Sequence, residues 1–416
     1  MDMKQKTVVE INCVNYFSTG KIMNRVAELG RAQGFDMMTS CPFSRSTQAH
    51  EIEHQILFGD RITRNLHLML AEYTGFHGCF SVIATLRFLH QLDGLHPALI
   101  HLHNLHNCYI NIPLLFHYIK KKRIPVVWTF HDCWPITGQC PYFDRSNCYR
   151  WETGCGSCPQ YNKYYPTSRV DRTKFMWKLK KRCFTGIEKL VIATPSQWMK
   201  QMVKRSFLKD SDIRVISNGV DLNTFYPRES DFRARHGIRK DQYMLLGVSS
   251  RWTEQKGIDV WIRLAQELDD RFRVVLVGTD QQEESMLPEN IIAIRRTTNQ
   301  SGLADIYSAA DLFVNPTREE CFGLVNIEAL ACGTPVLTFR TGGSPECVTA
   351  DTGSVVPCND FDALVKEIHR ICETAPFEAE ACRKRAAEFE INSQYQKYID
   401  VYTEIIGSSC DGDAKT

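Results

Sequence analysis

The stretch NPTREECFGLVNIEALACGTPV, residues 315–336, indicates most clearly how this chain of 416 residues folds. It continues an apolar run that begins at Leu312 and passes through a polar loop into a helical pattern. Gly333 ends that pattern, and a second apolar run begins at Pro335. A strand, a helix and a further strand in this order are typical of a parallel sheet covered by helices.

Two glutamates lie eight residues apart in this stretch. Glu320 comes just before the predicted helix, and Glu328 lies about two turns along it. The backbone amides of Gly323, Leu324 and Val325 open the helix, so they are suited to bind an anion such as a diphosphate. Glu320 is placed to accept hydrogen bonds from sugar hydroxyls, and Glu328 from ribose hydroxyls.

Apolar runs alternate with helical patterns along the whole chain, in two series. The first series has strand-like runs at Val8–Cys13, Ala98–Leu102, Val126–Phe130 and Leu190–Ala193. The second has them at Met244–Val248, Arg273–Val277, Ile291–Ile294, Leu312–Asn315 and Pro335–Phe339. This pattern predicts an α/β fold with two doubly wound parallel sheets, in which ligands bind at the carboxyl ends of the strands.

A turn-forming stretch near residues 217–227 separates the two series. We therefore expect an N-terminal Rossmann-like domain at 1–217 and a C-terminal one at 218–388. The tail, 389–416, has the spacing of an amphipathic helix that can cross back to the first domain. A cysteine-rich insert at about 133–160 interrupts the first domain.

A second motif, GVSSRWTEQKG at residues 247–257, follows the first strand of the second series. Together with the paired glutamates and the helix ending in Gly-Thr-Pro-Val, it resembles the retaining glycosyltransferases of family 4, which have the GT-B fold. The resemblance implies that Arg251 and Lys256 hold the diphosphate of a sugar donor. A fixed cation there stabilises the transition state more than the ground state, because negative charge grows on the leaving phosphate.

The same resemblance implies two domains that face a cleft and a retaining transfer from a nucleotide diphosphate sugar. A UDP-sugar is favoured and a GDP-sugar is the alternative donor. The acceptor is expected to be a glycan or a polyprenyl-diphosphate-linked glycan in capsule or exopolysaccharide synthesis. No catalytic metal is expected. A GT-B-like epimerase or phosphorylase and a non-catalytic nucleotide-sugar-binding homologue are the alternatives.

Further candidate site residues lie on other predicted strand ends. Arg296 occupies the strand end where similar enzymes seat the nucleobase. Gly20 ends a turn-rich loop before a helical pattern that starts at Lys21, and it lets the backbone approach a phosphate or a sugar closely. By resemblance, His131 lies beside the transferred sugar, and Asp132 orients it or contacts the acceptor. His101 and His103 alternate on one face of a strand, as some metal sites require. We nevertheless expect His103 to form hydrogen bonds near the acceptor, with a purely structural role and a metal site as the alternatives.

Four cysteines lie close together in the insert: Cys140, Cys148, Cys155 and Cys158. Four thiolates suit a closed tetrahedral zinc site, which would brace a loop too polar to build its own core. Unliganded thiols, disulfides and an iron–sulfur cluster are the alternatives.

The net charge of +2 hides an asymmetry, because residues 1–220 carry 29 Lys and Arg against 16 Asp and Glu. The basic segment 174–184 mixes cations with large apolar groups, which is compatible with an anionic membrane surface or with a helix packed in the domain. No nucleic-acid motif accompanies the charge. Without a signal peptide or an apolar run of about 20 residues, we expect a cytoplasmic protein with peripheral membrane contact.

Overall fold

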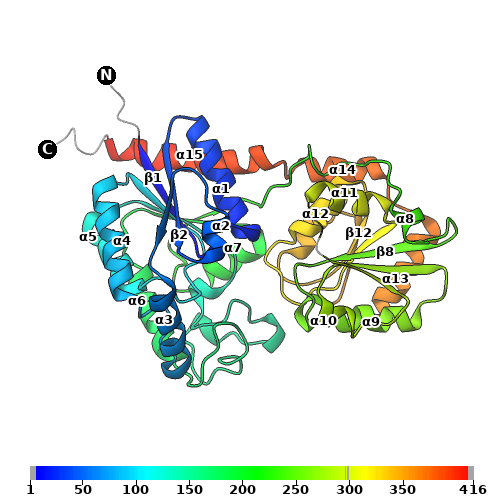
Figure 1. The fold of residues 1–416 in the computed structure, drawn as a ribbon, viewed down its shortest axis with the longest axis horizontal. Helices are drawn as coiled ribbons and strands as arrows, with labels where there is room; N and C mark the ends of the chain where they lie inside the picture. Colours follow the sequence, from blue (N-terminus) through cyan, green and yellow to red (C-terminus); the bar gives the residue numbers. More distant parts are fainter. Residues whose placement is uncertain (1–5, 296, 298, 411–416) are drawn as a thin grey trace. The chain divides into compact units, whose positions relative to one another are not determined.

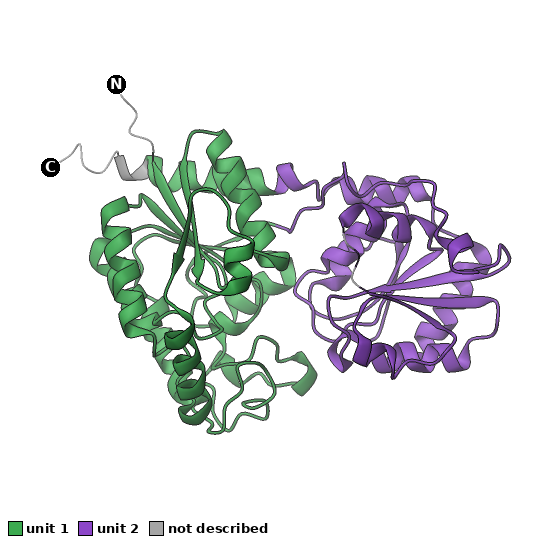
Figure 2. Cartoon of the chain, viewed as in Figure 1, with its two compact units in different colours: residues 1–216, 395–416 green, residues 217–394 purple. Residues whose placement is uncertain are grey.

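The computed structural model describes residues 6–295, 297 and 299–410, with side chains up to residue 407. The chain forms two compact units (Figure 2). Unit 1 comprises residues 1–216 and 395–416, and unit 2 comprises residues 217–394.

Unit 1 is built on a seven-stranded parallel sheet in the order β3-β2-β1-β4-β5-β6-β7. The strands are β1 (Thr7–Ile11), β2 (Asp36–Pro42), β3 (Gln55–Phe58), β4 (Leu99–Leu102), β5 (Val126–Thr129), β6 (Leu190–Thr194) and β7 (Asp212–Val215). In Figure 1, helices α4 (Val82–Leu95), α5 (Ile112–Lys122) and α6 (Thr173–Phe184) lie along one side, and α1 (Phe17–Ala32) and α7 (Gln197–Lys204) on the other. Two further helices, α2 (Arg45–Ala49) and α3 (Arg61–Thr74), flank β3 in sequence.

Unit 2 holds a six-stranded parallel sheet in the order β10-β9-β8-β11-β12-β13. Its strands are β8 (Tyr243–Val248), β9 (Phe272–Thr279), β10 (Ile291–Arg295), β11 (Leu312–Asn315), β12 (Val336–Phe339) and β13 (Gly353–Val356). Its helices are α8 (Phe232–Arg235), α9 (Ile258–Glu267), α10 (Gln281–Glu284), α11 (Gln300–Ala309), α12 (Leu324–Ala331), α13 (Phe361–Thr374) and α14 (Ala379–Ala387).

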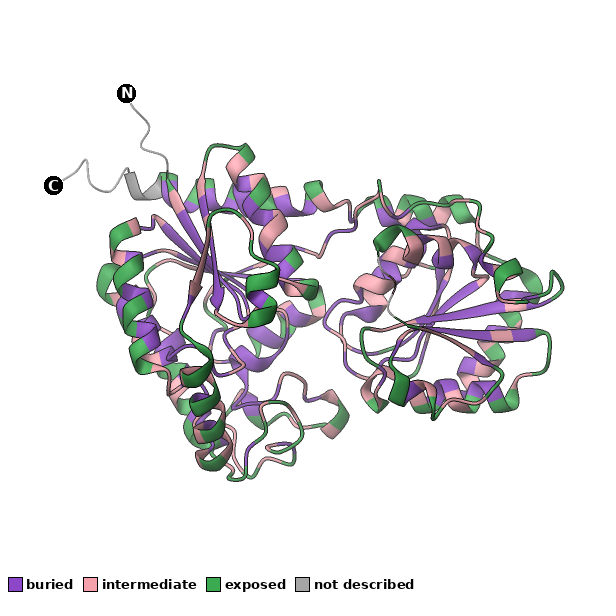
Figure 3. Cartoon of the chain, in the orientation of Figure 1, coloured by how far each residue is buried: buried purple, intermediate pink, exposed green. Residues whose placement is uncertain are grey.

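The sheet of unit 2 is buried on both faces because its strands are apolar at successive positions. On β8, Met244 and Leu246 pack into one core cluster with residues of α11, α12 and α14, whereas Leu245 packs into another with residues of α9 and α13. The two helix layers are visible on opposite sides of the sheet in Figure 1, and Figure 3 shows the buried strands between them. The predicted pair of doubly wound parallel sheets is therefore confirmed.

The last helix, α15 (Ile391–Cys410), starts in unit 2 and belongs to unit 1 from Tyr395 onward. Its apolar residues at helical spacing, including Tyr398, Tyr402 and Ile405, are buried in unit 1. No helix in the described part of the chain combines the length and hydropathy needed to cross a bilayer.

Candidate functional site

In unit 2, the loops after β8 and β11 bring Lys256 and Glu320 together. Lys256 ends the 3-10 helix η4 (Glu254–Lys256), and its Nζ lies 2.9 Å from Oε2 of Glu320. The Lys256 side chain is 36% exposed and that of Glu320 18%, so the pair is open to a ligand while partly shielded from water. The structure thus places a cation and a carboxylate at the carboxyl edge of the sheet, where ligands bind in this class of fold.

Close backbone contacts hold the loop of Glu320 against η4. Gly257 has φ +76°, and a Cβ there would lie 2.5 Å from the carbonyl oxygen of Pro316. The Arg318 amide donates to the Gln255 carbonyl at 2.8 Å, and its guanidinium makes two 2.7 Å contacts with the carboxylate of Asp259. This fork-to-carboxylate geometry fixes the loop in two directions, so Lys256 and Glu320 are positioned before any ligand binds.

Helix α12 begins immediately after Gly323, which has φ +91° and offers no side-chain cap. Leu324 and Val325 at its first turn are partly exposed. The side chain of Asn326 is buried and donates to Oγ of Ser344 at 2.9 Å, while its Oδ1 accepts from Nδ2 of Asn315 at 2.8 Å. These hydrogen bonds hold the start of α12 against β11 and against the loop of Ser344. They do not cap the N-terminus of the helix.

The glycine-rich loop after β12 packs directly on Glu320. Gly342 has φ +52°, and a Cβ at this position would lie 1.7 Å from the carbonyl oxygen of Glu320. The amide of Gly343 donates to that same oxygen at 3.1 Å. The backbone of this loop can therefore lie against the carbonyl of Glu320 only because Gly342 has no Cβ. The contact fixes the position of Glu320.

Glu328 lies on α12 with its Oε2 3.1 Å from the hydroxyl of Tyr307. Burial, reinforced by the Glu328 carboxylate, raises the pKa of Tyr307 well above its ordinary value, so the phenol donates this hydrogen bond. Glu328 itself is half-buried. One side of its carboxylate is thereby oriented by a fixed donor.

Arg251 and Arg296 were predicted to contact the donor. Arg251 is exposed after β8, and among the described residues it forms no ion pair. Arg296 lies outside the described residues. Its neighbour Arg295, at the end of β10, forms an ion pair with Glu284 of α10 at 2.9 Å.

In unit 1, the strand ends of β4 and β5 bring the predicted histidines together. Nδ1 of His103 lies 3.0 Å from Nε2 of His131. On the other side of the ring, Nε2 of His103 lies 3.9 Å from Oε2 of Glu10 on β1, and neither of these two buried atoms has a hydrogen-bond partner among the residues that the structure describes. Burial lowers the pKa of His131 to about 4, so its imidazole is neutral at neutral pH.

Asp132 is paired with a histidine that sequence reasoning did not assign to the site. Its Oδ2 lies 3.0 Å from Nε2 of His106, and its Oδ1 accepts the amide of Trp134 at 2.8 Å. Burial alone would raise the pKa of Asp132, but the neighbouring His106 lowers it below its ordinary value. Burial alone would lower the pKa of His106, but the Asp132 carboxylate raises it above its ordinary value. The two side chains therefore form a partly buried ion pair next to His131.

Glu10 is the second site residue that sequence reasoning missed, although a carboxylate inside an apolar strand was a usable signal. Ligand atoms of Glu10, His101 and His103 lie within 4.8 Å of one another, as in a metal site. Both ring nitrogens of His101 are already hydrogen-bonded, however, Nδ1 to the hydroxyl of Tyr402 and Nε2 to that of Thr129. The cluster is thus a hydrogen-bond network in which His103 has one ring nitrogen left.

Gly20 lies in the first turn of α1, because this helix begins at Phe17 and not after the glycine as the sequence suggested. A Cβ on Gly20 would lie 2.4 Å from the carbonyl carbon of Asn15. The close approach that requires a glycine here is made by the protein's own backbone.

The four cysteines of the insert line one small cavity of unit 1. All four are free thiols. Within the described residues, no three of their sulfurs lie within 4.8 Å of one another. The structure gathers them without bringing them to the spacing of a closed site.

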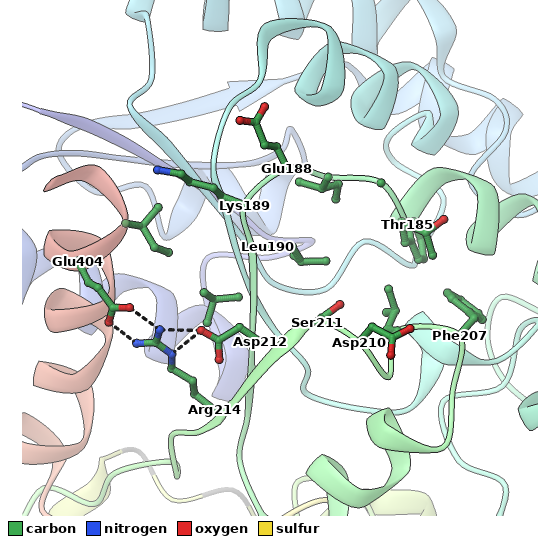
Figure 4. Close-up of a pocket in the computed structure, with 16 residues that line it drawn as sticks. Thr185, Glu188, Lys189, Leu190, Phe207, Asp210, Ser211, Asp212, Arg214 and Glu404 are labelled. Atoms are coloured by element: carbon green, nitrogen blue, oxygen red, sulfur yellow. Dashed lines mark hydrogen bonds and ion pairs between the residues drawn. The ribbon is translucent and has the colours of Figure 1, made fainter. Parts of the chain in front are cut away.

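A larger hollow in unit 1 lies at the opposite edge of the sheet from His131. It is lined by the residues that lead into β6 and β7, among them Lys189 and Asp212, and by Glu404 of α15 (Figure 4). Arg214 bridges Asp212 and Glu404 across it. Because it opens at the amino ends of the strands, this hollow is not where a doubly wound sheet binds its ligand.

Solved structures share the architecture of this chain. Sucrose-phosphate synthase from Thermosynechococcus elongatus aligns with a TM-score of 0.71 over 97% of this chain and 100% of that chain, at 21% identity. Anabaena Alr3699/HepE in complex with UDP and glucose aligns with a TM-score of 0.66 over 96% of this chain and 100% of that chain, at 14% identity. At these identities the likeness shows the fold, which is the predicted GT-B fold.

Two family models, which match consecutive parts of the chain, define its class. The model described as Glycosyltransferase Family 4 matches residues 23–224, and the model described as Glycosyl transferases group 1 matches residues 229–389. The protein is therefore a glycosyltransferase. It belongs to family 4, as the resemblance of its motifs predicted.

The names of similar proteins refer to different products and substrates. A protein of Escherichia coli K12, described as a colanic acid biosynthesis glycosyl transferase, WcaC, is 24% identical over 74% of this chain and 77% of that protein. The D-inositol 3-phosphate glycosyltransferase of Nocardiopsis dassonvillei is 31% identical over 51% of this chain and 55% of that protein. The chain spans about half the length of this second relative, and the likeness does not by itself define a substrate.

Proposed function

We propose that this glycosyltransferase moves a sugar from a UDP-sugar to a glycan or a polyprenyl-linked glycan acceptor with retention of the anomeric configuration. The Lys256–Glu320 pair at the open start of α12 carries this proposal. It offers a cation for the leaving diphosphate and a carboxylate for the hydroxyls of the sugar. The relative WcaC supports a polysaccharide pathway, and the UDP complex of HepE supports the choice of nucleotide.

The proposed transfer breaks the bond between the anomeric carbon and the β-phosphate oxygen. The acceptor oxygen forms a new bond to the same carbon from the same face, and its proton passes to the departing phosphate. Negative charge grows on that phosphate as the bond breaks, so Lys256, Arg251 and the amides of Gly323, Leu324 and Val325 stabilise the transition state. No protein base is required in this scheme, and no divalent metal is assigned a step.

The remaining side chains bind and orient. Glu328 accepts hydrogen bonds from the ribose, helped by the Tyr307 hydroxyl, which already occupies one of its oxygens. Neutral His131 donates to or accepts from a hydroxyl of the transferred sugar, and the Asp132–His106 pair borders the acceptor. Gly20 and Arg296 remain candidates for contacts to the donor.

A donor screen tests the proposal. Purified protein is titrated with UDP and GDP by calorimetry, and UDP- and GDP-sugars are then followed by NMR for hydrolysis or transfer. We expect tighter binding of UDP and release of a sugar with the donor's anomeric configuration. Preference for GDP, or an inverted anomer, would overturn the donor or the stereochemistry. Turnover that requires inorganic phosphate identifies a phosphorylase, and donor isomerisation without acceptor identifies an epimerase.

We also propose that unit 1 contacts an anionic membrane, with the apolar contact made by α3 and with segment 174–184 contributing cations only. Helix α6 buries Met176, Trp177 and Phe184, so most of its apolar face packs in the core. On α3, by contrast, four apolar side chains spaced by three or four residues are between 48 and 80% exposed: Ile62, Leu66, Met69 and Tyr73. Exposed cations accompany this stripe on α3, α4 and α6, namely Arg61, Arg87, Lys174 and Lys178.

Liposome flotation tests the membrane proposal. Binding to vesicles that contain anionic lipid is expected to exceed binding to neutral vesicles. The double variant Leu66→Glu/Met69→Glu should abolish it, because it places two charges on the apolar stripe. Met286→Glu is the matched control, since Met286 is an exposed methionine of unit 2. Equal flotation of the α3 variant and the wild type contradicts the proposal.

A further inference from the structure

The segment between β5 and α6 has little regular structure to hold it together. From Phe130 to Arg172, all of which the structure describes, it contains three single-turn 3-10 helices: η1 (Trp134–Ile136), η2 (Asp144–Ser146) and η3 (Arg150–Glu152). A loop of this length is uncommon in a compact domain. Inside it, the four thiols of Cys140, Cys148, Cys155 and Cys158 line one cavity.

Backbone amides are directed at two of these sulfurs. The amide of Gly138 donates to Sγ of Cys155 at 3.1 Å, and the amide of Gln160 donates to Sγ of Cys158 at 3.4 Å. Donors of this kind favour the thiolate over the thiol, because the hydrogen bond is stronger to a charged acceptor. Burial nevertheless raises the pKa of both thiols, so the amides hold the two sulfurs in place and a cation such as Zn²⁺ is needed to stabilise the thiolates.

A buried cation lies beside the same cavity. Lys180 of α6 is 0% exposed, and its Nζ donates to the carbonyl oxygens of Trp134 at 2.7 Å and Thr137 at 3.1 Å. No carboxylate among the described residues forms an ion pair with it. Thr137 in turn donates its hydroxyl to the carbonyl of Cys140 at 2.6 Å. A buried ammonium without a paired anion is costly, and burial accordingly lowers the pKa of Lys180 to about 7. A negative charge at the neighbouring cysteines would stabilise its protonated form.

We propose that Cys140, Cys148, Cys155 and Cys158 bind one Zn²⁺ as thiolates, with Lys180 as the buried counter-cation of the site. Four thiolates around Zn²⁺ carry a net charge of −2, of which Lys180 offsets one unit, and the thiol protons are released to solvent on binding. The sulfurs are not within 4.8 Å of one another in groups of three among the described residues. The loops that carry Cys148 and Cys155–Cys158 therefore close on the ion.

The site would brace the residues that follow His131. Trp134 accepts from Lys180 through its carbonyl oxygen and donates its amide to Asp132. A zinc ion at the cysteines would consequently stabilise the loop that positions the Asp132–His106 pair. The metal is structural in this assignment and takes no part in group transfer.

Metal content of the full chain, purified with zinc and a reducing agent, provides the first test. Native mass spectrometry should show about one zinc per chain, the stoichiometry of a closed Cys₄ site. Cys148→Ser and Cys158→Ser should each lose it, and the control Cys358→Ser should keep it, because Cys358 is exposed and outside the cluster. Cys148 is only partly buried, so its variant is expected to fold.

The counter-cation is tested by competition with a chelator. Lys180→Met should weaken zinc binding by about 10–100-fold, the usual cost of removing a group that supports metal ligands. Lys178→Met on the same helix is the control and should leave affinity unchanged, because Lys178 is exposed. If Lys180→Met does not fold, the cysteine variants and the chelator-induced fall in melting temperature of the wild type decide the matter.

Three results would overturn the assignment. The first is less than about half a zinc per chain in the reduced wild type. The second is zinc retained by both cysteine variants, which would place the ion elsewhere, for instance at Glu10, His101 and His103. The third is a thiol titration that shows the four cysteines to be joined as disulfides.

Discussion

Replacing Lys256 by methionine separates a catalytic cation from a structural one. The pair with Glu320 is more than a third exposed on the lysine side, so it should contribute at most about 1 kcal/mol to the free energy of unfolding. A cation that stabilises the leaving diphosphate is worth far more to the reaction, since loss of one such group costs about 10²–10³ in kcat, or roughly 3–4 kcal/mol. We therefore expect Lys256→Met to retain its stability and lose most of its turnover.

The assay pairs urea unfolding with kcat at saturating donor. Lys256→Arg, which keeps the charge in a different shape, should recover part of the rate. Lys366→Met is the control, because Lys366 is an exposed lysine on α13. A kcat within about threefold of the wild type would refute the role of Lys256, as one such donor is expected to be worth far more. A stability loss above about 3 kcal/mol would show that the pair is structural, because exposed pairs typically contribute at most about 1 kcal/mol.

Three more outcomes follow from the same geometry. Arg251→Ala should reduce kcat by about 10²–10³ with an unchanged unfolding free energy, since this exposed side chain has no ion pair among the described residues; normal turnover contradicts its role. Glu328→Ala should weaken UDP binding, measured by calorimetry, by a larger factor than it lowers kcat. A larger loss of kcat than of UDP affinity contradicts this role. Acid should destabilise unit 1, because burial lowers the pKa of His131 to about 4 in the folded protein. As the pH falls below about 6.5, the histidine is protonated in the unfolded chain but stays neutral in the folded one. This costs on the order of 3 kcal/mol by pH 4, and urea unfolding should show a smaller loss in His131→Asn.

The donor half of the fold was predictable because its signals are local. Gly333 and Pro335 end a helix and begin a strand within three residues, and the structure places α12 at Leu324–Ala331 and β12 at Val336–Phe339. Steric rules for Gly and Pro act within a turn, so no tertiary information is needed to read them. The start of α1 was missed because Gly20 looked like a loop residue, whereas its place in the helix depends on close contact with Asn15.

Strands whose identity depends on their neighbours could not be found in this way. β2 (Asp36–Pro42) contains buried Thr39 and Ser40, a composition that does not suggest a central strand. Its polar side chains are satisfied by other strands: Ser40 donates to the carbonyl of Glu10 at 2.8 Å, and Gln55 donates to the hydroxyl of Thr39 at 3.2 Å. The same holds for the histidine network, since His101 and Tyr402 are 301 residues apart in sequence. Hydrogen bonds over such separations leave no periodic pattern.

The contact between Lys256 and Glu320 has a consequence for which ligand binds. A diphosphate that approaches Lys256 also approaches the carboxylate 2.9 Å away, and the two anions repel each other. A sugar on the diphosphate changes this balance, because its hydroxyls donate hydrogen bonds to Glu320 and occupy the space between the charges. Free UDP has no such groups and leaves the carboxylate facing a phosphate. The pair would therefore favour the intact donor over the spent nucleotide, so that cleavage of the sugar weakens the hold on the product and assists its release.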